Sequence, residues 1–144
     1  MTELKFDGLM FLDDSLAYNF HKLYFLLRNK VTKSLEQYKL SPEQWHVIAV
    51  MHFSQKHIAQ KDICIMLQKE RHTISKLVNK MVSNGWLGRD GRSLYIHPEK
   101  IDLIPEIKSV VNQSLAEILP NENRRSLLLE CKKILKLAEA TAEV

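Results

Sequence analysis

The sequence predicts a single, mostly α-helical domain that carries one short β-hairpin. Its 144 residues match the size of one domain, and a hydrophobic fraction of 45% is enough to form a core. With only 4 Gly and 4 Pro the chain has few turn residues, so we expect about six helices. Apolar residues recur at spacings of three and four, which is the helical pattern, and Asp90-Gly91 is typical of a hairpin turn.

A long amphipathic helix is expected near the N-terminus, over residues 13–38. Its apolar stripe consists of Leu12, Leu16, Phe20, Leu23, Leu27, Val31 and Leu35. A helix this long in a small domain has more apolar surface than its own domain covers, which indicates a partner subunit.

The clearest helix start is Ser41-Pro42-Glu43-Gln44, where Ser41 can cap the helix, Pro42 suits its first position and Gln44 completes a capping box. This helix should end near Phe53. A shorter helix follows, and Ala59 at its cap position has no side-chain oxygen to accept a hydrogen bond.

The next helix, over residues 70–84, has two different faces. One is an apolar stripe of Ile74, Leu77, Val78 and Met81. The opposite face carries hydrogen-bond donors and positive charge without a carboxylate: His72, Thr73, Lys76, Asn79, Lys80 and Ser83. Such a face suits the anionic major groove of DNA, and Asn84-Gly85 is a favourable helix end.

A β-hairpin should follow, with Asp90-Gly91 as the central residues of a type I′ turn. That register sets Arg89 opposite Arg92, and the two like charges would repel unless an anion lay beside them. After the hairpin we expect one helix over residues 99–118, kinked by Pro105, and a last helix from Asn121 to about residue 138.

The net charge of +4 is concentrated in one part of the chain. Between Lys61 and Arg92 there are seven basic and three acidic residues, a difference of four that equals the charge of the whole chain. This window contains the donor-rich helix and the hairpin, so an anionic partner would meet both.

Several classes of function are not indicated. No apolar run is long enough for a membrane span, and the N-terminus does not resemble a signal peptide. Cys64 and Cys131 form no CxxC pair, so we expect a cytoplasmic protein. No two histidines have the four-residue spacing of a helical metal site, and no catalytic motif occurs, so we expect no metal, no cofactor and no enzymatic activity.

A helix pair that ends in a donor-rich helix and is followed by a hairpin is a winged helix-turn-helix. The run from Arg71 to Met81, RHTISKLVNKM, resembles the recognition-helix signature of the MarR family of bacterial transcription regulators. The starts Ser41-Pro42 and His97-Pro98, and the turn sequence Asp90-Gly91-Arg92, resemble further parts of the same family.

The resemblance implies a homodimer whose dimerisation helices lie in residues 13–38 and 99–138, with a DNA-binding lobe over residues 41–97. It implies a double-stranded-DNA-binding regulator, more often a repressor than an activator, that reads a pseudo-palindromic site. The DNA-contacting residues would be Arg71, His72, Thr73, Ser75, Lys76, Asn79, Lys80, Arg89 and Arg92, with Asp90 and Gly91 in the wing. In many relatives a small phenolic or amphipathic effector weakens DNA binding, and here Phe20, His21, Tyr24 and Trp45 are the candidate pocket residues.

Blander interpretations stay open beside these. A basic helix face can be merely hydrated, His72 can face water, and the four aromatic residues can be ordinary core. The wing is several residues shorter than is usual in the family, which limits the expected reach of Arg92 to phosphate. A winged helix used for protein interaction or RNA binding is therefore the alternative function.

Overall fold

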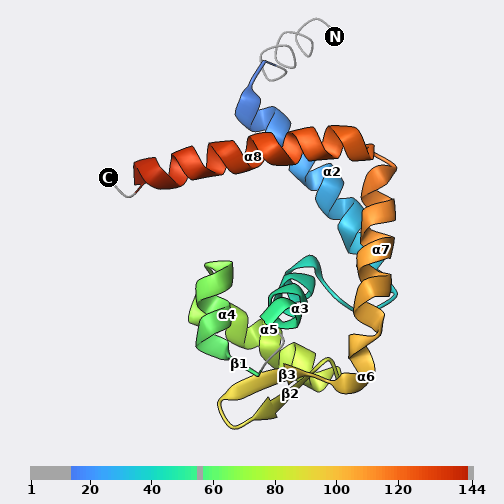
Figure 1. Cartoon of the computed structure of the whole chain (residues 1–144), viewed down its shortest axis with the longest axis vertical. Helices are drawn as coiled ribbons and strands as arrows, with labels where there is room; N and C mark the ends of the chain where they lie inside the picture. The colour runs from blue at the N-terminus through green and yellow to red at the C-terminus, as the bar shows by residue number, and fades with distance from the viewer. Residues whose placement is uncertain (1–13, 55–56, 143–144) are drawn as a thin grey trace, which may run out of the picture.

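The computed structural model describes residues 14–54 and 57–142, and these form a small lobe joined to a set of long helices (Figure 1). Leu12 and Asp13, where the first helix was expected to begin, lie outside the described residues. In chain order the elements are α2 (Leu16–Glu36), α3 (Pro42–Ser54), β1 (Ile58–Ala59), α4 (Gln60–Leu67), α5 (Arg71–Ser83), β2 (Leu87–Asp90), β3 (Ser93–Ile96), α6 (Pro98–Ile101), α7 (Leu103–Ala116) and α8 (Asn121–Ala142).

The predicted start of α3 is confirmed, with both bonds of the capping box present. The Gln44 backbone N–H donates to Ser41 Oγ over 3.2 Å, and the Ser41 backbone N–H donates to Gln44 Oε1 over 3.0 Å. Together these bonds satisfy two donors that a bare helix end would leave unpaired. Pro42 is the first residue of α3, as expected.

The lobe is built around one hydrophobic core to which α3, α4, α5 and the strands each contribute. From α5 it takes Ile74, Val78 and Met81, all fully buried, so the predicted apolar stripe is confirmed. Val47 and Ile48 of α3 and Ile63 of α4 are also fully buried. Burying these side chains fixes the rotation of α5 about its own axis, and its polar face is consequently held outward.

The end of α5 is fixed by a Schellman motif. The Trp86 N–H donates to the Met81 carbonyl over 3.0 Å, and the Gly85 N–H donates to the Val82 carbonyl over 3.3 Å. Gly85 has a φ of 87°, a left-handed conformation that glycine adopts without steric cost. Because the Trp86 side chain is buried, the direction of the chain after α5 is fixed, and β2 begins at the next residue.

Strand β1 was not expected from the sequence. It pairs antiparallel with β3, so the hairpin becomes a three-stranded sheet in the order β1-β3-β2. Ala59 pairs with Ser93 and also precedes α4 as its N-cap residue, where it makes no side-chain hydrogen bond. Its backbone is therefore held by the sheet rather than by a capping side chain. A two-residue strand leaves no periodic pattern to detect.

The predicted hairpin register is wrong. In the structure Arg89 pairs with Leu94 and Asp90 with Ser93, so the loop is Gly91-Arg92 rather than Asp90-Gly91. Gly91 has a φ of 60° and Arg92 has no positive φ, which fits a type II′ turn with glycine first and excludes type I′. The two arginines therefore do not face each other, and the expected repulsion between them is absent.

The prediction of one kinked helix over residues 99–118 is also wrong. The segment forms two helices, α6 and α7, which are separated at Asp102. Pro105 lies in the first turn of α7, where its missing N–H would have had no intrahelical partner. In a continuous helix the Pro105 ring would clash with the carbonyl of Ile101, which lies four residues earlier. Ile101 is accordingly the last residue of α6.

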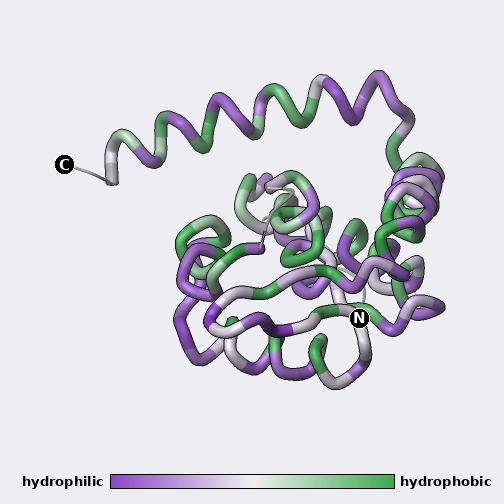
Figure 2. The backbone as a smooth tube through the Cα atoms, turned by 60° about the horizontal axis from the view of Figure 1, so that its bottom comes forward, coloured by the Kyte–Doolittle hydropathy of each residue, from purple (hydrophilic) through white to green (hydrophobic). Residues whose placement is uncertain are grey.

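The long helices extend beyond the lobe. Along α2 the apolar stripe changes from exposed at Leu16 (71% exposed) to fully buried at Leu35. The C-terminal half of α8 stands clear of the rest of the chain in both views (Figures 1 and 2), although it carries large apolar residues. None of the helices described is long and apolar enough to cross a membrane.

Gln68 ends α4 in a left-handed conformation with a φ of 53°, which costs a residue with a Cβ about 1–2 kcal/mol. We expect Gln68→Gly to raise the free energy of unfolding by about 0.5 kcal/mol, because glycine avoids that cost but gains entropy in the unfolded chain. Urea unfolding measures the change.

Gln113→Gly is the matched control for Gln68→Gly, because Gln113 is exposed within α7. It should lower the free energy of unfolding by about 1 kcal/mol. If Gln68→Gly and Gln113→Gly both lowered the free energy of unfolding, the proposed backbone strain at Gln68 would be contradicted.

Candidate nucleic-acid interface

The outer face of α5 is the largest set of sequence-predicted site residues that the structure brings together. Arg71, His72, Lys76, Asn79 and Lys80 are exposed, while Thr73 and Ser75 are half-buried beside the core stripe. No acidic residue occurs in α5 itself. This face therefore presents cationic groups and hydrogen-bond donors at the spacing of successive helical turns.

One predicted contact residue is already engaged. His72 Nδ1 lies 3.3 Å from Glu70 Oε2, and both side chains are largely exposed. Glu70 is the N-cap residue of α5 but makes no side-chain capping bond. His72 would have to leave this carboxylate to meet a base or phosphate. Within residues 14–54 and 57–142, no three histidine, cysteine or acidic residues are placed to hold a metal ion.

The wing is joined to α5 by a hydrogen bond that the sequence did not reveal. Arg89 Nη2 of β2 donates to Asn79 Oδ1 of α5 over 2.7 Å. Both residues were predicted to contact DNA, and the bond places the guanidinium of Arg89 beside the exposed face of α5. Arg92 is exposed in the hairpin loop, apart from Arg89 in the register.

The wing is held against the residue that precedes β1, His57, by an aromatic contact and a polar contact. The Tyr95 ring stacks on His57 at a centroid distance of 5.2 Å, and His57 Nδ1 lies 3.4 Å from Asp90 Oδ2. Gly88 pairs with Tyr95, and a Cβ at Gly88 would lie 2.3 Å from the Tyr95 ring. The glycine therefore allows the ring to cross β2. Asp90, predicted only as a turn residue, instead contacts His57.

The predicted effector residues are only partly brought together. Tyr24 lines an apolar pocket of about 360 Å³ between α2, α3 and α8, a volume within the range of small-molecule sites. Phe20 and His21 lie about one turn earlier on α2, where His21 packs edge-on against Phe25, and Trp45 packs against the core. Their roles stay predictions.

Sequence reasoning missed most of the pocket wall. Arg28 follows Tyr24 by one helical turn, which is a signal that could have been used. Leu115, Leu127 and Cys131 come from α7 and α8, and only the tertiary arrangement brings them to α2.

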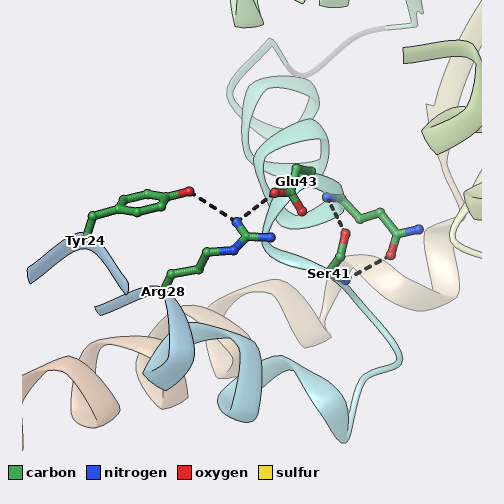
Figure 3. A network of polar contacts seen from close by, with 5 residues as sticks. Tyr24, Arg28, Ser41 and Glu43 are labelled. Carbon is green, nitrogen blue, oxygen red and sulfur yellow. Dashed lines mark hydrogen bonds and ion pairs between the residues drawn. The ribbon is translucent and has the colours of Figure 1, made fainter. Parts of the chain in front are cut away.

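Arg28 lies between Tyr24 and Glu43 (Figure 3). Its Nη1 donates to Glu43 Oε1 over 2.7 Å and to the Tyr24 hydroxyl over 3.5 Å. The hydrogen bond from Arg28 lowers the pKa of the Glu43 carboxyl, and the bond to Glu43 raises the pKa of Arg28. This ion pair joins α2 to the first turn of α3.

Solved structures of MarR-family regulators share this fold. They include CouR from Rhodococcus jostii bound to p-coumaroyl-CoA (15% identity, TM-score 0.75, covering 87% of this chain and 91% of that chain). The DNA complex of Rv2887, a MarR-family protein of Mycobacterium tuberculosis, has 15% identity, a TM-score of 0.71 and coverages of 83% and 97%. The DNA complex of MepR from Staphylococcus aureus has 22% identity, a TM-score of 0.70 and coverages of 88% and 98%. No protein-family model matches the sequence, and no curated protein does.

The lowered pKa of Glu43 makes the contribution of this ion pair dependent on pH. Stability from a carboxylate whose pKa is lowered by folding is present above its unfolded pKa of about 4.3 and is lost as the pH falls through the folded value. At pH 7 we expect the free energy of unfolding of the wild type to exceed that of Glu43→Gln by at most about 1 kcal/mol. The difference is small because the side chains of Arg28 and Glu43 are each about one-third exposed. Urea unfolding should show this difference unchanged down to about pH 5 and shrinking below about pH 4.

Glu139→Gln, which removes an exposed carboxylate from α8, controls for the change in net charge. If the difference in free energy of unfolding between wild type and Glu43→Gln grew as the pH fell, the stabilising role of the ion pair would be contradicted.

Proposed function

We propose that this chain is a sequence-specific double-stranded-DNA-binding transcription regulator that acts as a homodimer, normally as a repressor. The observation that carries the proposal is the exposed cationic face of α5, supported on a buried apolar stripe and hydrogen-bonded to Arg89 of the wing. An α-helix fits the major groove of B-DNA, and the face outside the core is the one that would enter it.

The side chains divide by the contacts that suit them. Arg71 and Lys76 can bind guanine or phosphate, and Thr73 and Ser75 can bond base edges or phosphate. Lys80 lies further along the exposed face, where we place it on the phosphate backbone. Arg89 and Arg92 would contact the backbone beside the groove, and the two-residue hairpin loop limits how far they extend.

The homodimer would bury the apolar faces that one chain leaves exposed. On α2 these include Leu16 and Phe20, at 71% and 39% exposed, and on α8 they include Ile134, Leu135 and Leu137, each at least 50% exposed. A monomer rarely leaves this much contiguous apolar surface in water. A two-fold axis through these helices would set two α5 helices in successive major grooves, about 34 Å apart.

The solved structures that share the fold support both parts of the proposal. Rv2887 and MepR were solved in complex with DNA, and CouR was solved with a small-molecule ligand. We therefore propose that an amphipathic effector occupies the pocket beside Tyr24 and weakens DNA binding. Both cysteines are free thiols, in keeping with the cytoplasmic location that we propose.

The DNA-binding proposal predicts that Arg71→Ala combined with Lys76→Ala weakens binding at least about thirty-fold. Each lost contact costs about 1 kcal/mol or more. The slope of log affinity against log salt should also fall by about 2, because fewer counterions are released. Fluorescence anisotropy with a duplex selected from a random pool measures both quantities.

Lys108→Ala combined with Lys136→Ala removes the same charge from exposed positions on α7 and α8, and should leave affinity nearly unchanged. Equal effects of the two double variants would indicate nonspecific attraction. Failure to select any duplex, together with binding to RNA or to a protein, would favour the alternative of an interaction module.

The dimer proposal predicts that Leu135→Glu shifts the protein from dimer to monomer at micromolar concentration, because it places a charge within the apolar contact. Sedimentation velocity measures the change. Lys108→Glu, on the exposed surface of α7, is the control and should remain dimeric. If Leu135→Glu left the dimer intact, the proposal that this part of α8 lies in the dimer interface would be wrong.

A further inference from the structure

We infer that Asn79 positions Arg89 for DNA and does not itself read a base. Its side-chain oxygen holds the guanidinium of Arg89 beside the exposed face of α5, where the positive charge meets a phosphate. The inference rests on the proposed function and specifies how the wing takes part in it. Three observations carry it: the direction of the hydrogen bond between the two side chains, the charge that Arg89 retains, and the place of Arg89 on β2.

The Asn79 side chain is engaged through its oxygen. Arg89 Nη2 lies 2.7 Å from Asn79 Oδ1, and a guanidinium can only donate, so the atom that faces it must be the amide oxygen. Bidentate recognition of adenine requires both this oxygen and the amide nitrogen. While the bond to Arg89 is made, Asn79 is therefore poorly placed to read adenine, which is the base that an asparagine side chain otherwise suits.

Arg89 retains its positive charge in this arrangement. Asn79 is neutral, α5 contains no acidic residue, and within residues 14–54 and 57–142 no acidic side chain forms an ion pair with Arg89. The neighbouring Asp90 contacts His57 instead, at 3.4 Å. A carboxylate in place of Asn79 would hold the guanidinium but would also cancel its charge. The neutral amide orients the cation and leaves its charge and its remaining N–H donors for an anion.

Arg89 lies on the stem of the wing, so its contact does not depend on the length of the loop. Asn79 follows the buried Val78, and Arg89 comes shortly after the buried Trp86, so both ends of the bond are anchored in one core. A free arginine side chain has to be ordered when it binds, at a cost in affinity, whereas here the ordering takes place on folding. The short hairpin, whose two-residue loop contains Arg92, can therefore still deliver one fixed cation to the DNA backbone.

A double-mutant cycle tests the assignment by fluorescence anisotropy with a duplex selected from a random pool. Arg89→Ala should weaken binding about tenfold and lower the slope of log affinity against log salt by about 1. Asn79→Ala should weaken binding about threefold with the slope nearly unchanged, because Arg89 keeps its charge and loses only its orientation. In the Arg89→Ala background, Asn79→Ala should cause no further loss. A loss of the same size in both backgrounds would mean that Asn79 contacts DNA itself, and would overturn the inference.

Asn79→Asp separates the orientation of Arg89 from its charge. The carboxylate can still accept the hydrogen bond but cancels the charge of the guanidinium. Affinity should therefore fall further than in Asn79→Ala, and the salt slope should decrease by about 1. A salt slope equal to that of the wild type would contradict the role of the neutral amide.

Lys80→Ala is the matched control, because Lys80 is the next residue of α5, is exposed, and makes no hydrogen bond to Arg89 in the part of the chain that the structure describes. Its effect on affinity should be the same with and without Arg89→Ala. Duplex selection with Asn79→Ala should also return the base sequence that the wild type selects. A preference lost at one base pair would assign base reading to Asn79 and overturn the inference.

NMR of the free protein separates this inference from the proposed function. The heteronuclear NOE of the Arg89 Nε–Hε group should exceed that of Arg92 in the exposed loop, and in Asn79→Ala it should fall to the level of Arg92. If Arg89 is already as mobile as Arg92 in the wild type, the inference is wrong whether or not DNA binds. If the NMR contrast is present and no duplex can be selected, Asn79 does position Arg89 and the proposed function fails.

Discussion

The fold depends on the burial of one face of α5. Ile74, Val78 and Met81 are fully buried, and their burial leaves the opposite face of the helix in solvent. The same stripe sets the path of the chain beyond α5, because the Met81 carbonyl accepts the Trp86 N–H and the Trp86 side chain enters the core. The start of β2 is thereby fixed relative to α5, and Arg89 is brought within hydrogen-bond distance of Asn79. One packing requirement therefore orients both α5 and the wing.

Features that depend on neighbouring residues were predictable from the sequence. The capping box at Ser41 and Gln44, the stripe of α5 and its Gly85 terminus all arise from local chemistry, and all three are present. The hairpin register was not predictable from its turn dipeptide, because Asp90-Gly91 and Gly91-Arg92 are both acceptable loops. The observed register fits the burial of Trp86 in the core and the Tyr95 ring, which lies over Gly88 where a Cβ would collide with it.

The candidate site divides in the same way. The exposed residues of α5 share a face by helical periodicity alone, whereas the Arg89–Asn79 bond and the pocket wall join elements distant in sequence. Arg28 shows the difficulty. In the sequence it is one of several basic residues on the polar side of a long helix. Only the folded chain places it between Tyr24 and Glu43 (Figure 3). This ion pair joins α2 to α3 beside the hydrophobic core that the two helices share.

The sheet order has a consequence for solubility. A strand edge with unpaired backbone groups can recruit strands from other chains, which is a common route to aggregation. Here β3 is central, β1 covers one side with only two residues, and the other edge, β2, is four residues long and ends in Arg89 and Asp90. A short edge that carries charge is a poor template for intermolecular pairing. The β1 pairing that escaped sequence analysis therefore also shields part of the free edge of β3.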